Sequence, residues 1–187
     1  MNAPAFRHLG EREVHRGRIW RVVVGTFAAP DGTTFERDVV RSPGAVGVVP
    51  ILFDAEGSAA VVLLRIYRPA LDAEMVEIPA GMRDVAGEDP ETTARRELRE
   101  EIGMDADDIE LLTVFHNSAG MTDGTTHVYL ASGLRAVGSD HQGPEEHAMA
   151  VFELPLAEAF ARVSNGTITD AKTVVGVLLA WQRLAAD

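Results

Sequence analysis

The chain has 187 residues, of which 46% are hydrophobic, so it is long enough to bury the core of one domain. Its 17 basic and 29 acidic residues give a formal charge of -12, which disfavours binding to nucleic acid, and the absence of cysteine excludes a disulfide framework and a zinc thiolate site. No apolar run approaches membrane-spanning length and the N-terminus lacks a signal-peptide core, so we expect no membrane contact and a cytoplasmic protein.

Residues 1–43 are expected to form an N-terminal arm of two or three antiparallel strands. Two valine-rich runs, residues 22–24 and 39–40, flank the turn sequence Pro30-Asp31-Gly32, which is typical of a hairpin. A sheet this small is only marginally stable alone, so the arm would gain from pairing with a second subunit.

The remaining segment, residues 44–187, is predicted to mix strands and helices in an α/β fold. Strands are expected over residues 45–53, 59–66, 75–78, 111–115, 125–131 and 148–152. Residues 138–143 are expected to be a flexible loop. Two C-terminal helices are expected over residues 156–163 and 169–184, broken at Asn165-Gly166, with Thr169 or Asp170 capping the second.

One further helix is predicted between Asp89, which can cap it, and Gly103, which can end it. Pro90 suits the first helical position. Its apolar stripe should face the core and consists of Ala94, Leu98 and Ile102.

Three carboxylates, Glu97, Glu100 and Glu101, lie on neighbouring turns of that helix. Like charges three or four positions apart cost roughly a few tenths of a kcal/mol per pair, so a positive group should compensate them. Hard divalent cations take carboxylate oxygens and are commonly completed by substrate phosphates. The alternative interpretation is an ordinary solvated acidic face.

The flanks of the helix favour the metal site. The sequence Glu77-Ile78-Pro79-Ala80-Gly81 is followed by Glu88, and Arg96 begins the run Arg-Glu-Leu-Arg-Glu-Glu-Ile-Gly-Met. This pattern resembles the Nudix box of the Nudix hydrolase family: Gly, five residues, Glu, seven residues, Arg-Glu, an apolar residue, any residue, Glu-Glu, any residue, Gly and an apolar residue. Every fixed residue type is present, and one spacing departs, because six residues separate Gly81 from Glu88.

The resemblance implies an α/β/α sandwich and a metal-dependent pyrophosphatase that holds Mg2+ or Mn2+. Its metal ligands would be the Ala80 carbonyl and three acids, Glu97, Glu100 and Glu101. Arg96 would pair with Glu88 and fix the loop between Gly81 and the helix. The resemblance also implies a general base on a mobile loop beyond the second strand after the box, for which Glu145 and Glu146 are the candidates, with no choice between them.

Further resemblance to ADP-ribose hydrolases concerns the substrate. Tyr67-Arg68-Pro69 matches a segment whose arginine reaches the phosphates in that subgroup, although Arg68 also suits a strand-end surface position. The segment Asn117-Ser118-Ala119-Gly120-Met121-Thr122-Asp123 resembles a subgroup loop, but Ala119 replaces its marker proline. The candidate substrate-binding residues are Arg41, Arg68, Gly81 and Met121.

The expected activity is therefore hydrolysis of a nucleotide sugar, ADP-ribose, to AMP and ribose 5-phosphate. One alternative keeps the chemistry and changes the substrate to another sugar nucleotide such as GDP-mannose. A second alternative is a module that senses ADP-ribose without turnover. The resemblance also implies a homodimer in which N-terminal strands are exchanged between subunits.

Overall fold

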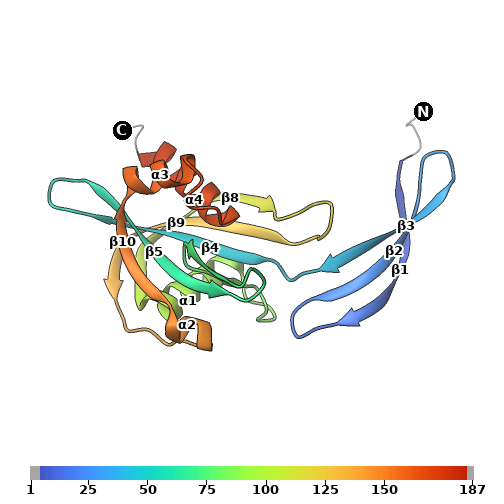
Figure 1. The fold of residues 1–187 in the computed structure, drawn as a ribbon, viewed down its shortest axis with the longest axis horizontal. Coiled ribbons are helices and arrows are strands. Elements are labelled where there is room, and N and C mark those ends of the chain that lie inside the picture. The colour runs from blue at the N-terminus through green and yellow to red at the C-terminus, as the bar shows by residue number, and fades with distance from the viewer. Residues whose placement is uncertain (1–4, 185–187) are drawn as a thin grey trace. The chain divides into compact units, whose positions relative to one another are not determined.

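The computed structural model describes residues 5–184, and the chain divides into two compact units (Figure 1). The first unit comprises Met1–Gly44 and His116–Thr125, and the second comprises Ala45–Phe115 and Thr126–Asp187. The first unit thus contains the predicted arm together with a ten-residue loop that lies far from it in sequence.

The first unit is built on a three-stranded antiparallel sheet with strand order β1-β2-β3. Its strands are β1 (Arg7–Arg16), β2 (Arg21–Ala28) and β3 (Thr34–Arg41). The predicted turn joins β2 to β3, and its Gly32 adopts a φ of 88°, a left-handed value that favours glycine. The loop lies along β3, since the Val40 N–H donates to the Met121 carbonyl at 2.9 Å. The expected hairpin is confirmed.

The second unit contains a seven-stranded mixed sheet with the main order β10-β5-β4-β9-β8. Its strands are β4 (Ala45–Phe53), β5 (Ala59–Arg68), β6 (Ala73–Glu77), β7 (Ala80–Met82), β8 (Met104–His116), β9 (Thr125–Ala136) and β10 (Ala150–Pro155). The valine-rich β4 is central: it runs parallel to β9 and antiparallel to β5 and β7. Because both faces of β4 are covered, its residues are almost all buried.

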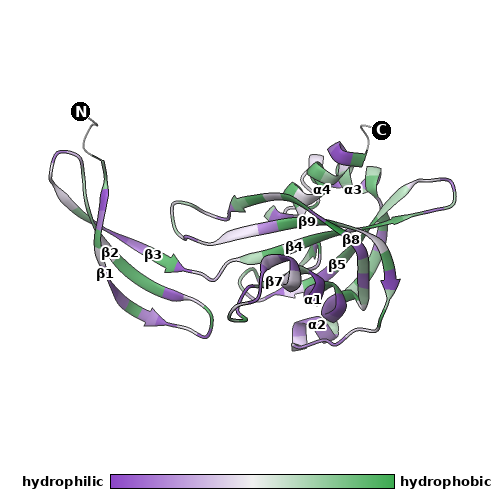
Figure 2. Cartoon of the chain, turned by 180° about the vertical axis from the view of Figure 1, so that it is seen from behind, coloured by the Kyte–Doolittle hydropathy of each residue, from purple (hydrophilic) through white to green (hydrophobic). Residues whose placement is uncertain are grey.

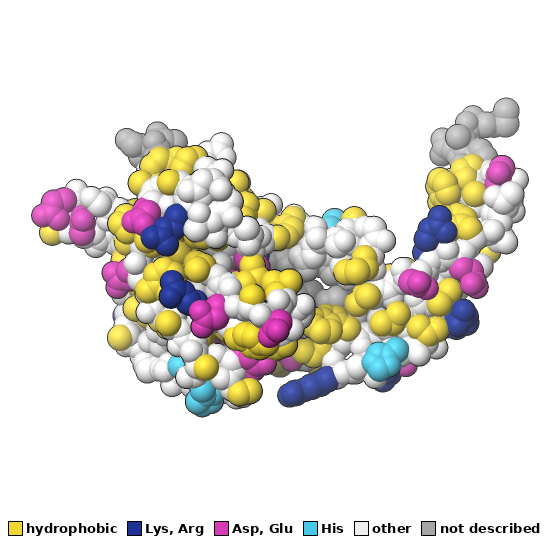
Figure 3. All heavy atoms as spheres, in the orientation of Figure 1, with side chains coloured by type: hydrophobic (Ala, Val, Ile, Leu, Met, Phe, Trp, Pro, Cys, Tyr) yellow, Lys and Arg dark blue, Asp and Glu magenta, His cyan; other side chains and the backbone are white. Residues whose placement is uncertain are grey.

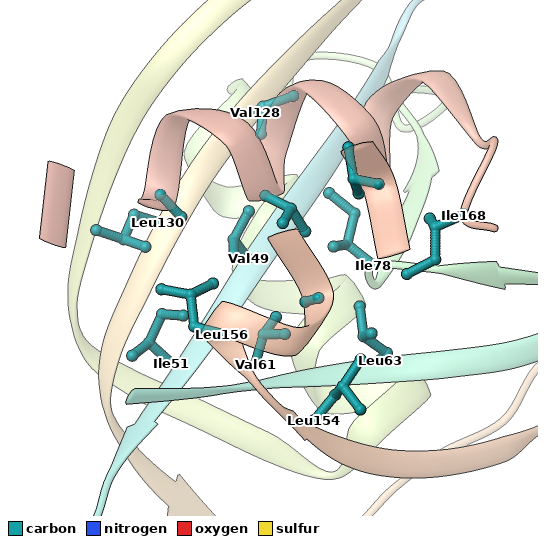
Figure 4. Packing of buried hydrophobic residues seen from close by; sticks show 14 residues of the cluster. Val49, Ile51, Val61, Leu63, Ile78, Val128, Leu130, Leu154, Leu156 and Ile168 are labelled. Atoms are coloured by element: carbon teal, nitrogen blue, oxygen red, sulfur yellow. The ribbon is translucent and has the colours of Figure 1, made fainter. Parts of the chain in front are cut away.

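Helices cover both faces of this sheet. They are α1 (Pro90–Ile102), α2 (Pro144–Ala148), α3 (Leu156–Ser164) and α4 (Ala171–Leu184). In Figure 1, α3 and α4 lie on one side of the sheet and α1 lies on the other. Figure 4 shows the core between the strands and the C-terminal helices, where residues such as Val49, Leu63 and Ile78 pack. A second cluster joins β4 to α1 through Val48 and Leu98. The predicted α/β/α sandwich is confirmed.

Hydropathy follows this layering. In Figure 2, β4 is largely hydrophobic, whereas α1 is largely hydrophilic apart from the stripe that it buries. Asp170 caps α4, because its carboxylate accepts from the Thr173 N–H at 3.0 Å, which decides between the two capping residues considered. Among the described residues, no helix is both long and apolar enough to cross a membrane.

Several predicted bounds were wrong, and β9, expected to end at residue 131, continues to Ala136. The strand expected from residue 111 already begins at Met104. Near its start, the buried Asp105 is held by Arg99 at 2.9 Å and by Arg135 at 2.8 Å. Glu145 and Glu146, expected in a loop, belong to the short helix α2, which begins at Pro144 because proline is preset for the first helical position.

Candidate active site

The helix α1 is fixed at both ends in the way that its sequence predicts. The Asp89 carboxylate accepts from the N–H groups of Glu91 and Thr92 at 3.0 and 3.1 Å. Gly103 ends the helix in the left-handed conformation with a φ of 65°. Ala94 and Leu98 are completely buried, so α1 presents a fixed face to the sheet. The acidic residues of α1 that lie beside Ala94 and Leu98 are therefore held in a fixed position.

Two of the three predicted metal-binding acids are turned into the protein. Glu97 is 6% exposed and Glu101 is 4% exposed, while Glu100 is partly exposed. The Glu101 carboxylate accepts from the Ala80 N–H at 2.8 Å, which ties α1 to β7. The neighbouring Gly81 makes room for the other acid, because a Cβ at this position would lie 2.0 Å from Glu97 Oε1. The structure therefore brings together Ala80, Gly81, Glu97 and Glu101.

Burial governs the charge of both acids. Burial raises the pKa of Glu97 to about 7, with Glu100 and Glu146 adding to the effect and Arg96 opposing it. Burial likewise raises the pKa of Glu101 to about 8, opposed by the Ala80 hydrogen bond and supported by Glu97 and Glu146. The carboxylates of Glu97, Glu101 and Glu146 thus lie close together, and the positive charge around them is too small to balance theirs.

Arg96 supplies part of that positive charge. Its Nη1 lies 2.7 Å from Glu97 Oε1 and 2.9 Å from Glu100 Oε2. The expected contact with Glu88 is present at 3.4 Å, and the buried Thr93 hydroxyl also donates to Glu88 at 2.9 Å. Arg96 therefore connects the loop before α1 to two of the three acids.

The chemistry of these residues fits a hard divalent cation. The available donors are carboxylate oxygens beside the backbone of Ala80, which are the ligand types that such cations prefer. The cradle at Gly81, which only a residue without a Cβ leaves open, lets the Glu97 carboxylate lie against β7. Within residues 5–184, no three acidic or histidine side chains converge as a preformed ligand set, and Arg96 contacts both Glu97 and Glu100.

One of the two candidate bases, Glu146, lies near the acids of α1. Its charge is among those that raise the pKa of both Glu97 and Glu101. The Glu146 carboxylate accepts from the Gln142 N–H at 2.7 Å, so it is oriented by the turn that precedes α2. Glu146 is thus the candidate that lies beside the acids of α1.

Arg68, the predicted phosphate-binding residue, is held by a buried acid. Its Nε and Nη2 donate to the two oxygens of Glu77, each at 2.7 Å. Lys172 also donates to Glu77, and Asp170 accepts from Lys172 at 3.0 Å. Arg68 and Glu101 act on each other's pKa, so the group lies beside the acids.

The other predicted substrate-binding residues, Arg41 and Met121, line a pocket of about 360 Å³ in the first unit. Phe27 and Ala119 line it as well. Arg41 is fixed there by Asp123, whose carboxylate lies 3.0 Å from Nη1. This pocket offers an aromatic ring and a guanidinium to a ligand.

Sequence reasoning missed the group formed by Glu77, Lys172 and Asp170. Glu77 lies in the segment quoted for the resemblance, but Lys172 follows it by 95 residues, and no spacing rule connects the two. Only the packing of α4 beside β6 brings them together.

Comparisons with known proteins agree with this fold and site. The family model described as NUDIX domain matches residues 42–174. The ADP-ribose pyrophosphatase of Mycobacterium tuberculosis is 37% identical over 173 residues, which cover 92% of this chain and 82% of that protein. The methanol dehydrogenase activator of Bacillus methanolicus is 37% identical over 169 residues, which cover 88% and 86%.

A solved structure described as that of an ADP compounds hydrolase has the same fold. Its TM-score is 0.83 over 100% of this chain and 97% of that chain, at 21% sequence identity. The family model, the two relatives and the Nudix box on α1 lead to one conclusion. The chain belongs to the Nudix family.

Proposed function

We propose that the chain hydrolyses the pyrophosphate bond of ADP-ribose to give AMP and ribose 5-phosphate, with Mg2+ or Mn2+ as its metal. The observation that carries this proposal is the pair of buried acids, Glu97 and Glu101, placed against Ala80 and Gly81 by the helix α1. The 37% identity to a protein named ADP-ribose pyrophosphatase supports the choice of substrate.

The proposed metal ligands are the carboxylates of Glu97, Glu100 and Glu101 and the carbonyl of Ala80. A cation bound there would neutralise the pyrophosphate and lower the pKa of an attacking water. Arg96 would move away from Glu97 and Glu100 far enough to leave their oxygens to the metal, while Glu88 keeps hold of its guanidinium.

Glu146 is the proposed general base. It would accept a proton from the water as the water oxygen attacks phosphorus, and the bond to the bridging oxygen would break. Its position near Glu97 and Glu101 supports this role, as does the Gln142 N–H that orients it. Glu145 would remain a surface acid of α2.

Arg68 would bind a phosphate oxygen of the substrate. In the first unit, the pocket lined by Arg41, Met121 and Phe27 is a candidate for binding a base or a phosphate. Guanidinium groups bind phosphate through two parallel hydrogen bonds, and an aromatic ring offers a stacking surface to a base. Gly81 would contact the substrate only through its backbone, because it has no side chain. The same lack of a side chain leaves room for the Glu97 carboxylate.

Product analysis tests this proposal. Incubation of ADP-ribose with the protein and Mg2+ should yield AMP and ribose 5-phosphate in equal amounts on anion-exchange chromatography. Release of ADP and free ribose would contradict cleavage at the pyrophosphate. No reaction of the wild-type protein with any sugar nucleotide, despite tight binding, would favour the sensing module.

A second substrate is a specific alternative because Ala119, which replaces the subgroup's marker proline, lines the pocket of the first unit. The same assay should therefore include GDP-mannose at equal concentration. A higher kcat/KM for GDP-mannose would keep the proposed chemistry and change the substrate.

We also propose a homodimer that pairs through the arm. All residues of β1 are exposed, although this edge strand carries Leu9 and Val14. Figure 3 shows hydrophobic side chains interspersed with charged ones on the visible face of the arm. Exposed apolar residues on an edge strand are typical of a surface that pairs with another chain.

Light scattering after size-exclusion chromatography tests the dimer. Val14→Glu should convert a species of twice the chain mass into one of 20.1 kDa. Val137→Glu is the matched control, because Val137 in the second unit is 50% exposed and Val14 is 49% exposed. A wild-type protein that elutes at the mass of one chain would contradict the dimer.

A further inference from the structure

The group around Glu77 is unusual for a buried cluster because one carboxylate holds two cations. The Glu77 side chain is 2% exposed, yet it accepts from Arg68 through both oxygens and from Lys172 through one. Burial alone would raise the pKa of Glu77, but the contacts with Arg68 and Lys172 outweigh burial and lower it. Glu77 is therefore a carboxylate anion.

The contact leaves one edge of the Arg68 guanidinium for another partner. A guanidinium has five N–H groups, and Glu77 takes one from Nε and one from Nη2. The remaining three, two on Nη1 and one on Nη2, point away from Glu77. The Arg68 side chain is 38% exposed, so part of it is accessible to a ligand.

Arg68 lies near the acids of α1, since the charges of Arg68 and Glu101 act on each other's pKa. Glu101 in turn is tied to Ala80 on β7, three residues after Glu77 on β6. The segment from Glu77 to Gly81 thus positions both the guanidinium and the acids.

We infer that Glu77 is a positioning residue for hydrolysis: its two oxygens fix the guanidinium of Arg68 so that the free edge binds the substrate's pyrophosphate. This inference rests on the proposed function and extends it to a residue that touches neither metal nor substrate. Arg68 would bind the phosphate and Glu77 at the same time. Lys172, which is anchored by Asp170, supplies a second positive charge to Glu77.

Stability alone is a weak reason for such a cluster. Replacement of buried ion pairs by well-packed apolar residues is often neutral or stabilising, because burial of the charges costs about as much as their attraction returns. Fixing a flexible side chain before the substrate arrives lowers the entropy that binding would otherwise lose. The role that we assign to the contacts of Glu77 is therefore to orient Arg68.

Glu77→Gln tests the inference, because the amide keeps the shape but presents an NH2 group to a partner that can only donate. Arg68 would lose its fixed orientation, and KM for ADP-ribose should rise on the order of 10- to 100-fold with a smaller change in kcat. A folding defect would give the opposite result, with less active enzyme, a lower apparent kcat and an unchanged KM.

A double-mutant cycle isolates the action through Arg68. Arg68→Lys keeps the charge and removes the two-bond contact, so Glu77→Gln should change KM less than about 2-fold in that background. Equal effects of Glu77→Gln with and without Arg68→Lys would overturn the inference.

Asp105→Asn is the matched control. Asp105 is also a buried carboxylate that contacts arginines, Arg99 and Arg135 among them, and its pKa is also lowered. The change should lower the melting temperature while KM stays within about 2-fold of wild type. If Asp105→Asn raised KM as much as Glu77→Gln, the effect would be a general loss of packing and the positioning role would be refuted.

Failure of the proposed function gives a different result. A wild-type protein without turnover would refute the hydrolysis, and the positioning of Arg68 for the pyrophosphate would then be tested by calorimetric binding of ADP-ribose to the wild type. In that assay, Glu77→Gln should weaken Kd by a similar factor of about 10 to 100. An unchanged Kd would refute the positioning role whatever the outcome of the turnover assay.

Discussion

At the scale of single residues, environment separates acids that the sequence presents as equivalent. Glu100 stays partly exposed, while Glu97 and Glu101 are buried and have raised pKa values. Glu77 is also buried, but its pKa is lowered because Arg68 and Lys172 surround it. A raised pKa marks a place with a deficit of positive charge, and a lowered one marks a place where that charge is already supplied.

We propose Glu146 rather than Glu145 as the general base among the acids of α2. Glu146→Gln should lower kcat on the order of 100-fold or more, since general base catalysis typically contributes about 100- to 10,000-fold. Glu145→Gln, an identical change one residue away, should stay within about 3-fold of wild type. Steady-state kinetics with ADP-ribose measures both variants. A larger loss for Glu145→Gln than for Glu146→Gln would contradict the assignment of the base.

At the scale of elements, the site depends on how closely α1 approaches β7. Gly81→Ala should lower kcat/KM on the order of 100-fold, because the new Cβ would lie 2.0 Å from Glu97 Oε1 and displace that carboxylate. Circular dichroism should show an unchanged content of helix and strand.

Gly17→Ala serves as the control for this change. Its Cβ would meet the Trp20 carbonyl at 3.3 Å in the arm, so a small adjustment suffices and activity should persist. Wild-type turnover by Gly81→Ala would show that Glu97 does not need its place against β7.

The elements that could be predicted from the sequence are those set by local rules. Asp89, Pro90 and Gly103 fix α1 through contacts within a few residues, so the helix and its acidic face followed from spacing alone. The start of β8 was missed, and its Asp105 has a partner, Arg135, that lies 30 residues away. The helix α2 was missed because a five-residue helix leaves almost no periodic signal.

The residues of the candidate site also divide into those set by local sequence and those set by distant contacts. The residues of the box lie within one loop and one helix, so a linear pattern reports them. The pairing of Glu77 with Lys172 and the proximity of Glu146 to Glu101 both depend on packing between distant segments. Such contacts could not be predicted without the fold.

At the scale of the whole molecule, the buried acids link stability to pH. An acid whose pKa is raised by folding binds its proton more tightly in the folded state than in the unfolded one, so stability falls as pH rises. For Glu97 and Glu101 the fall should begin above the ordinary value of 4.5 and end near 7 and 8. Without metal, the melting temperature should therefore be lower at pH 8.5 than at pH 6.

A bound cation should offset this loss of stability at high pH, because it neutralises the carboxylates of Glu97 and Glu101 after their protons are lost. Mg2+ should raise the melting temperature more at pH 8.5 than at pH 6, as differential scanning fluorimetry would measure. Glu101→Gln should show a smaller dependence on pH than the wild type, since one of the two buried acids is gone. An equal effect of Mg2+ at both pH values would argue against a cation site at these acids.

The central claim is that the acids of α1 hold the metal that drives pyrophosphate hydrolysis. The most direct test is release of AMP from ADP-ribose across a titration of Mg2+, for the wild type and for Glu101→Gln. We expect saturable, Mg2+-dependent turnover by the wild type and a loss on the order of 100-fold or more for Glu101→Gln with little change in melting temperature. Comparable turnover by the two proteins, or AMP release by the wild type in excess EDTA, would contradict the claim.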